Sequence, residues 1–109
     1  FKTKGRKILV MGDMLELGDD SVDFHRQIGD FIAKKPIDML ITLGELSKFT
    51  AETLKSEAKD NRQILSFYSK HELTDFLKRN TKAGDILLIK GSRLLKMEEI
   101  TFSLQKYAL

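Results

Sequence analysis

The chain has 109 residues, of which 41% are hydrophobic and 32% charged, a size and composition typical of one globular domain rather than a disordered or fibrous protein. It has no cysteine, which excludes disulfide bonds, thiolate nucleophiles and cysteine-ligated metals within it. The net charge is only +3, with basic and acidic residues interspersed, a pattern that does not favour a nucleic-acid partner.

Long apolar segments are missing from the sequence. The longest aliphatic run covers residues 86–89, far below the roughly 20 residues that a membrane span needs. The first residues do not resemble a signal peptide. We therefore expect a cytoplasmic protein with no membrane span. The chain starts at Phe1 instead of methionine, which we interpret as the mark of a processed or excised piece of a larger protein.

Four short apolar runs predict β-strands, at residues 7–11, 38–43, 63–67 and 85–89. The first, second and fourth are apolar on successive residues, as expected of strands buried on both faces of a parallel sheet. The third run is less apolar, which is typical of an edge strand.

Helical patterns separate these runs. Apolar spacing predicts a helix around residues 24–32, propensity favours one over residues 45–59, and the last apolar stripe extends from Met97 to Ala108. Ser69 followed by Glu72 is typical of a capping box that opens another helix. This strict alternation predicts an α/β fold, a three-layer α/β/α, Rossmann-like domain with right-handed crossovers.

Ligands of open parallel sheets bind beyond the carboxyl ends of the strands, where the strand order reverses. The loop after the first predicted strand, residues 12–20, offers Asp13 and Glu16 there. These carboxylates could hold a metal, a ribose hydroxyl or an ammonium group. Alternatively, they favour the start of the next helix through its dipole, an explanation that suits Asp19 and Asp20 better.

The loop after the fourth predicted strand places Lys90, Ser92 and Arg93 around a glycine. Such a loop can approach a carboxylate or phosphate closely, although an exposed basic turn is the alternative. His25 follows the acidic loop, and a lone helical histidine is more often structural than catalytic. The glycine-rich phosphate-binding motifs and metal-binding histidine spacings are absent, so we expect neither a self-sufficient nucleotide site nor a metal site.

Four motifs together resemble the C-terminal domain of the Mur ligases, over nearly the whole chain. They are G-D-M-L-E-L-G at residues 12–18, which includes Met14, H-R-Q-I-G at 25–29, K-G-S-R at 90–93 and M-E-E-I at 97–100. A related family member that adds a diamino acid carries D-N-P-R where this chain has G-E-L-S at 44–47, and G-K-G-H-E in place of K-G-S-R. The resemblance is therefore nearest to the branch that adds D-alanyl-D-alanine.

This resemblance implies a three-domain, ATP-dependent ligase of peptidoglycan synthesis. An N-terminal domain would hold UDP-N-acetylmuramoyl-tripeptide, and a central domain would carry the P-loop and the magnesium sites. Residues 1–109 would be the C-terminal domain, which closes over the other two and helps to place D-alanyl-D-alanine and the nucleotide. The family domain begins earlier, with a strand that leads into a D-S-Y-N-A-N-P-like segment absent from this sequence. The resemblance therefore implies that about the first two strands and one helix of the family domain are lacking, including a nucleotide contact. We therefore expect a truncated domain that is inactive alone and binds neither ATP nor magnesium tightly.

The family resemblance also places the fourth strand beside the first, giving four mainly parallel strands in the order 4-1-2-3. The acidic loop and residues 90–93 would then converge at one point. Arg93, with Lys90 and Ser92, would hold the carboxylate of D-alanyl-D-alanine. Asp13 or Glu16 would face its ammonium group, or orient the loop through His25. No catalytic residue is expected in this chain, and the open edge of the fourth strand is expected to favour association.

A receiver-like or flavodoxin-like signalling module is the alternative from another functional class. Its size and its alternation of strands and helices match, and Asp13 and Lys90 would fill two of the positions that receivers use. No aspartate follows the third predicted strand to accept a phosphoryl group, which counts against this alternative. A binding module without any catalytic role is the third possibility.

Overall fold

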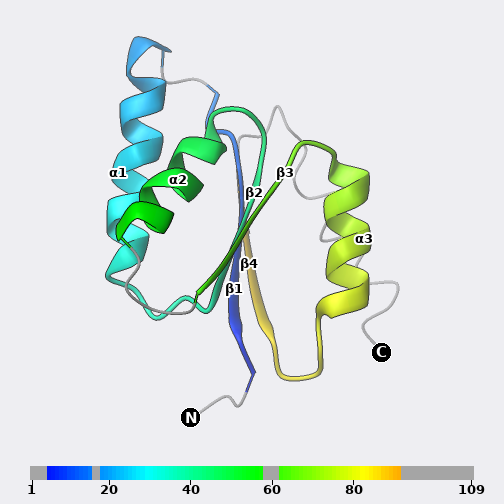
Figure 1. Cartoon of the computed structure of the whole chain (residues 1–109). Helices are drawn as coiled ribbons and strands as arrows, with labels where there is room; N and C mark the ends of the chain where they lie inside the picture. Colours follow the sequence, from blue (N-terminus) through cyan, green and yellow to red (C-terminus); the bar gives the residue numbers. More distant parts are fainter. Residues whose placement is uncertain (1–4, 16–17, 58–61, 92–109) are drawn as a thin grey trace.

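The computed structural model of the chain describes residues 5–15, 18–57 and 62–91. The four predicted strands and the three predicted helices within these ranges are present. The helix predicted between Met97 and Ala108 lies outside the described residues. In chain order the elements are β1 (Lys7–Gly12), the short 3₁₀ helix η1 (Gly18–Asp20), α1 (Ser21–Ala33), β2 (Met39–Leu43), α2 (Ser47–Glu57), β3 (Gln63–Phe67), α3 (Lys70–Asn80) and β4 (Ile86–Lys90) (Figure 1).

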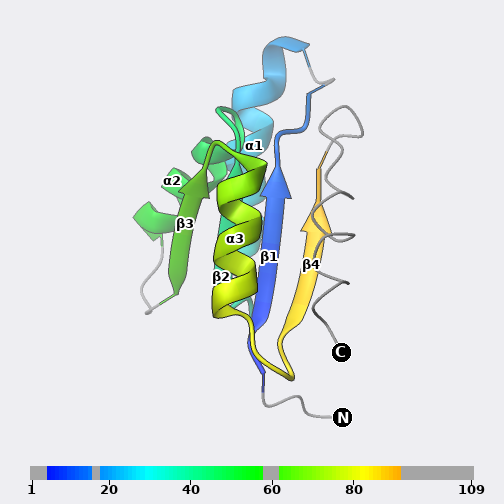
Figure 2. The same ribbon diagram turned by 90° about the vertical axis from the view of Figure 1, so that its right-hand side faces the viewer.

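The strands form one parallel sheet in the order β3-β2-β1-β4, which is the predicted order counted from the other edge. Helices α1 and α2 cover one face and α3 covers the other, so the domain has the three predicted layers (Figures 1 and 2). The steps from β1 to β2 to β3 run in one direction across the sheet and the step to β4 runs back. Right-handed crossovers therefore place α3 on the opposite face from α1 and α2.

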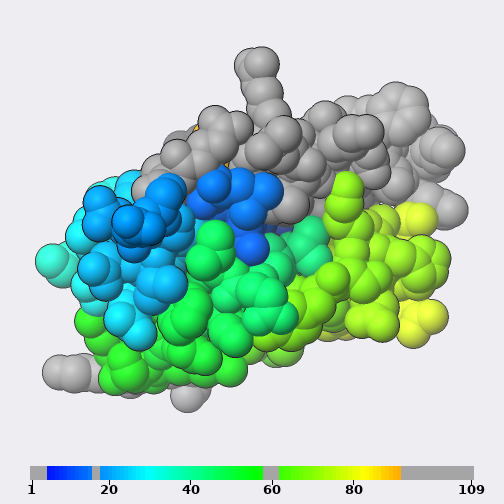
Figure 3. Space-filling view, turned by 90° about the horizontal axis from the view of Figure 1, so that it is seen from above, coloured from blue at the N-terminus to red at the C-terminus, as the bar shows by residue number. Residues whose placement is uncertain are grey.

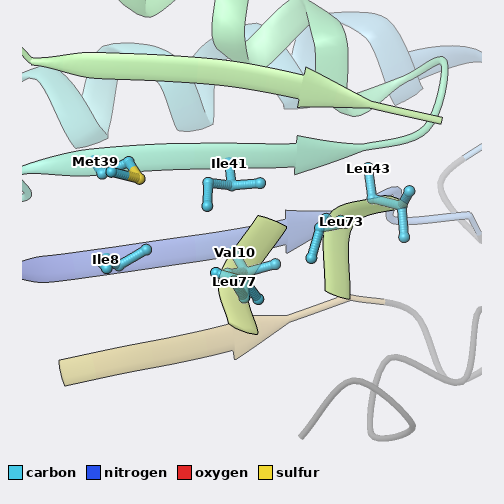
Figure 4. Close-up of a cluster of buried hydrophobic side chains, with 7 residues drawn as sticks. All are labelled: Ile8, Val10, Met39, Ile41, Leu43, Leu73 and Leu77. Atoms are coloured by element: carbon cyan, nitrogen blue, oxygen red, sulfur yellow. The ribbon is translucent and has the colours of Figure 1, made fainter. Parts of the chain in front are cut away.

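The core has two layers, one on each face of the sheet. The cluster on the α3 side is drawn in Figure 4 and consists of Ile8, Val10, Met39, Ile41, Leu43, Leu73 and Leu77. The cluster under α1 and α2 consists of Leu9, Met11, Ile32, Leu40, Ala51 and Leu54. Successive residues of a strand point to opposite faces, so the unbroken apolar runs of β1 and β2 supply both clusters. The prediction of two-sided burial is confirmed for these two strands.

For the fourth strand that prediction is wrong. β4 lies at an edge of the sheet, and its burial alternates along the strand. Leu87 and Ile89 pack against the α3-side cluster, whereas Ile86 and Leu88 are 48% and 49% exposed. The reason is geometric, because β4 lies beyond α1, so no described helix covers this face of the strand (Figure 2).

Two local features explain how the helices are placed. The Ser69 hydroxyl accepts a hydrogen bond from the backbone N–H of Glu72 at 3.3 Å, so Ser69 caps α3 as the sequence predicts. Gly29 lies where α1 crosses α2, and a Cβ there would lie 2.8 Å from the Thr50 carbonyl oxygen. This glycine therefore permits the close approach of the two helices. Across the described parts of the chain, every helix is too short or too polar to traverse a membrane.

An ion pair joins the amino ends of β1 and β4. The Asp85 side chain is only 4% exposed and lies 2.9 Å from the Arg6 guanidinium. It also accepts the backbone N–H groups of Arg6 and Lys82, both at 2.9 Å. The same guanidinium donates to the carbonyl oxygen of Asn80, the last residue of α3. The hydrogen bond from Arg6 lowers the pKa of Asp85 from its ordinary 3.8 to about 2.

This pKa predicts a specific acid sensitivity. A carboxylate whose pKa is lowered by folding stabilises the fold above its ordinary pKa and loses that effect as the pH falls through the lowered value. The shift at Asp85 corresponds to on the order of 2 kcal/mol. We expect Asp85→Asn to reduce the free energy of unfolding by about 1–2 kcal/mol at neutral pH. The gap from the unsubstituted chain should narrow as the pH falls from about 4 towards about 2.

Urea unfolding at a series of pH values measures this difference. Glu52→Gln, which removes an exposed carboxylate from the middle of α2, is the matched control and should leave the pH dependence nearly unchanged. Parallel pH profiles for the Asp85→Asn variant and the unsubstituted chain would contradict the assignment.

Candidate functional site

The strand order reverses between β1 and β4, because the chain leaves β1 in one direction and returns to its other side after β3 (Figure 2). Met11 and Lys90 are neighbours in the register of these two strands. The ends of β1 and β4 therefore lie side by side at the carboxyl edge of the sheet. In the view onto this end, the end of β1 (dark blue) borders the segment around the start of α2 (green) (Figure 3). This edge is where the sequence predicts a binding site.

Asp13, the residue directly after β1, is 7% exposed and faces the start of α2. Its two carboxylate oxygens accept different backbone N–H groups, from Ser47 at 2.6 Å and from Leu46 at 3.1 Å. These N–H groups belong to the turn that opens α2 and have no partner within that helix. Asp13 thus caps α2 from a neighbouring loop, so its role in this structure is positional.

Gly44 makes this contact possible. Its φ angle is +117°, a region that favours glycine. A Cβ at this position would lie 2.5 Å from the carboxyl carbon and both carboxylate oxygens of Asp13. The link between Gly44 and Asp13 could not be predicted from the family motifs, in which Gly44 serves only to separate two branches. The sequence feature that could have indicated this contact is a glycine directly after a buried strand.

His25 holds the loop from the other side. Its ring is fully buried, its Nε2 accepts the backbone N–H of Met14 at 3.1 Å, and its Nδ1 lies 2.5 Å from the Ser21 carbonyl oxygen. A backbone N–H can only donate and a carbonyl oxygen can only accept, so the ring is neutral with its proton on Nδ1. His25 therefore orients the backbone of the acidic loop at Met14.

A buried threonine continues this network into α2. The Thr50 hydroxyl donates to the carbonyl oxygen of His25 at 2.6 Å and is fully buried. Sequence reasoning missed Thr50, because a lone threonine within a helical pattern carries no signal of such a contact. The loop after β1 is thus tied to α2 by Asp13 directly and by His25 through Thr50.

The other predicted site residues have different positions. Lys90 ends β4 and is exposed beside the loop after β1. Glu16, Ser92 and Arg93 lie outside the described residues, so their roles stay predictions. Asp19 lies in η1, just before α1, as the helix-dipole explanation expects.

The chemistry available at this edge is binding and positioning. Within residues 5–15, 18–57 and 62–91, no three histidine, aspartate or glutamate side chains are grouped closely enough to hold a metal ion. The sequence contains neither of the glycine-rich phosphate-binding motifs considered above. The edge instead presents the exposed ammonium group of Lys90 next to a loop with a fixed backbone. That combination suits an anionic ligand held against one wall of a larger site.

A protein-family model described as "Mur ligase, glutamate ligase domain" matches residues 1–93. The chain belongs to the Mur ligase family. It corresponds to the C-terminal domain of these enzymes, as the motifs predict. The match decides against the receiver-like or flavodoxin-like alternative.

Individual relatives agree with this assignment. The chain is similar to the UDP-N-acetylmuramoyl-tripeptide–D-alanyl-D-alanine ligases of Bacillus subtilis, at 43% identity over 97 residues, and Haemophilus influenzae, at 33% over 107 residues. These matches cover 88% and 91% of this chain and 21% of each relative. The chain therefore spans about a fifth of the length of these relatives.

Solved structures show the same fold. A crystal structure of MurF from Acinetobacter baumannii matches with a TM-score of 0.77 and 28% identity, over 94% of this chain and 22% of that one. MurF from Thermotoga maritima in complex with ADP matches with a TM-score of 0.71 at 24% identity, over 95% of this chain and 22% of that one. The predicted α/β fold is thus confirmed.

The cap on α2 gives a testable prediction for the site. We expect Asp13→Ala to lower the free energy of unfolding by about 1–2 kcal/mol, because it removes the acceptor of two backbone N–H groups. Glu45→Ala is the matched control, since that carboxylate lies in the turn before α2 that Asp13 caps, but it is exposed and pairs with Lys48. We expect the control to change stability by less than about 1 kcal/mol. Urea unfolding of the three chains measures both effects, and equal losses for the two variants would contradict the capping role.

Proposed function

We propose that this chain is the C-terminal domain of the ligase that joins D-alanyl-D-alanine to UDP-N-acetylmuramoyl-tripeptide in peptidoglycan synthesis. The observation that carries the proposal is the 43% identity with the Bacillus subtilis ligase of that name, over 88% of this chain. The domain would span residues 1–109 and would lack the first strands of the family domain. Its partners would be the enzyme's own N-terminal and central domains.

The proposed reaction forms an amide bond at the expense of ATP. The carboxylate of the acceptor peptide is activated as an acyl phosphate, the amine of D-alanyl-D-alanine attacks its carbonyl carbon, and the tetrahedral intermediate collapses to the amide with loss of phosphate. The ATP and magnesium sites would belong to the central domain, which agrees with the lack of a P-loop motif in this sequence. The fragment alone would not be catalytic. Because its proposed substrates are a nucleotide-linked precursor and ATP, we propose that the complete enzyme acts in the cytoplasm.

The role proposed for this domain is to hold the incoming dipeptide. The carboxylate of the dipeptide would be bound by Arg93, with Lys90 and Ser92. A guanidinium group can bind a carboxylate through two parallel hydrogen bonds. Support comes from the position of Lys90, which ends β4 beside the loop after β1.

The ammonium group of the dipeptide requires an acidic partner. Both oxygens of Asp13 already accept backbone N–H groups, so Glu16 is the carboxylate we propose for this contact. Asp13 and His25 would act indirectly, because they fix the loop that carries Met14 and Glu16.

This proposal predicts the effect of one substitution in the complete ligase. Loss of a charge-assisted contact costs about 1.5–3 kcal/mol, so we expect Arg93→Ala to raise the KM for D-alanyl-D-alanine by roughly tenfold to a hundredfold. The KM for ATP should stay unchanged, and Arg93→Lys should restore part of the loss. Steady-state kinetics with each substrate varied in turn measure these constants.

The matched control removes a cation at the other end of the sheet. Arg79 is exposed in the last turn of α3, so Arg79→Ala should leave all three Michaelis constants unchanged. An unchanged dipeptide KM in Arg93→Ala would overturn the proposed carboxylate contact.

A further inference from the structure

The first turn of α2 reaches the loop after β1 by two routes. In the first, backbone N–H groups at the start of α2 bind the carboxylate of Asp13 directly. In the second, the Thr50 hydroxyl donates to the carbonyl oxygen of His25 at 2.6 Å, and the ring of His25 accepts the backbone N–H of Met14 at 3.1 Å. The two routes end at consecutive residues, Asp13 and Met14. Together they fix the direction in which the backbone leaves β1.

The second route passes through α1 and depends on how that helix lies against α2. The two helices pack together on one face of the sheet (Figure 1). The Thr50 hydroxyl bonds to His25, and the Thr50 carbonyl oxygen would lie 2.8 Å from a Cβ at Gly29. Thr50 thus faces two positions of α1 that are about one helical turn apart. These contacts set the position of α1 along α2, and with it the position of the His25 ring.

The chemistry of Thr50 distinguishes this contact from ordinary helix packing. Thr50 and His25 are both fully buried. A valine has nearly the same shape as a threonine and would fill the space between the helices without burying a polar group, which is costly unless it is hydrogen-bonded. The hydroxyl adds what an apolar side chain cannot, a directional bond that holds the buried network in one arrangement.

We propose that Thr50 is a positioning residue for dipeptide binding, which acts through His25 on the backbone of Met14 without touching the substrate. In the proposed function, on which this inference rests, Lys90 lies at the dipeptide site. Lys90 is the register neighbour of Met11, so the backbone that His25 holds continues from a strand end beside Lys90. A displaced loop changes the space next to Lys90 and weakens dipeptide binding. ATP binding, proposed for the central domain, does not depend on this loop.

Thr50→Val in the complete ligase tests this inference, because valine keeps the shape of threonine and removes the hydrogen bond. We expect the KM for D-alanyl-D-alanine to rise by roughly threefold to tenfold, the range that corresponds to one neutral hydrogen bond. The kcat and the KM for ATP should stay unchanged. Thr50→Ser, which restores a hydroxyl, should recover most of the loss. Steady-state kinetics with each substrate varied in turn measure these constants, and Thr50→Ala replaces Thr50→Val if that variant does not fold.

Hydrogen exchange at the backbone amide of Met14 gives a readout that is independent of activity. The His25 ring holds this N–H, so its exchange should be faster in Thr50→Val than in the unsubstituted ligase and should return towards the original rate in Thr50→Ser. Mass spectrometry with fragmentation to single residues measures the exchange rate.

Thr53→Val is the matched control, since Thr53 lies on the same helix and also faces Gly29. Within the part of the chain that the structure describes, its hydroxyl makes no hydrogen bond to α1. The control should change neither the dipeptide KM nor the exchange at Met14. Equal effects of Thr50→Val and Thr53→Val would reveal a general loss of packing and overturn the inference.

Two further outcomes would contradict the role of Thr50. One is an unchanged exchange rate at Met14 in Thr50→Val. The other is faster exchange with an unchanged dipeptide KM, in a ligase whose dipeptide KM does rise in Arg93→Ala. If Arg93→Ala also leaves that KM unchanged, the proposed dipeptide site itself is wrong, and the positioning role of Thr50 falls with it.

Discussion

The contact between the Asp13 carboxylate and the backbone N–H groups of Leu46 and Ser47 determines how the carboxyl end of the sheet is built. It joins the loop after β1 to the start of α2, and it requires a glycine at position 44, since any Cβ there would overlap the carboxylate. His25 and Thr50 tie the same loop to α1 and α2 through buried hydrogen bonds. The start of this loop, at Asp13 and Met14, is therefore held in place before any ligand arrives. Such pre-organisation reduces the ordering cost of binding.

Where the strand order reverses between β1 and β4, some residues hold the backbone in place and others are free to face a ligand. An acidic residue directly after a strand suggests a ligand contact, but Asp13 uses both oxygens within the domain. The exposed cation at the end of β4, Lys90, is available to an anion. In the proposed ligase this domain would form one wall of the dipeptide site, and the activation of the acceptor carboxylate would take place elsewhere in the enzyme.

The strands and the helices could be predicted from the sequence, because their apolar patterns are local. The strand order came from the family resemblance, since these patterns do not say which strands pair. The Ser69 cap is equally local, since its partner Glu72 lies in the same turn. The cap by Asp13 could not be predicted, because its partners lie 33 and 34 residues away and are backbone groups without a sequence signature. The burial of β4 was mispredicted for an instructive reason. Its apolar pattern fits a strand covered on both faces, and within the described residues only one face is covered.

We propose that the cations at and after the end of β4 receive the dipeptide, while Asp13 stays hydrogen-bonded to the start of α2. The most direct measurement is a crystal structure of the complete ligase with D-alanyl-D-alanine and a non-hydrolysable ATP analogue. Our account predicts the dipeptide carboxylate at hydrogen-bond distance from Arg93 or Lys90, with Asp13 still bound to the N–H groups of Leu46 and Ser47. A structure in which Asp13 leaves those groups to bind the dipeptide ammonium, or in which the carboxylate lies away from residues 90–93, would contradict it.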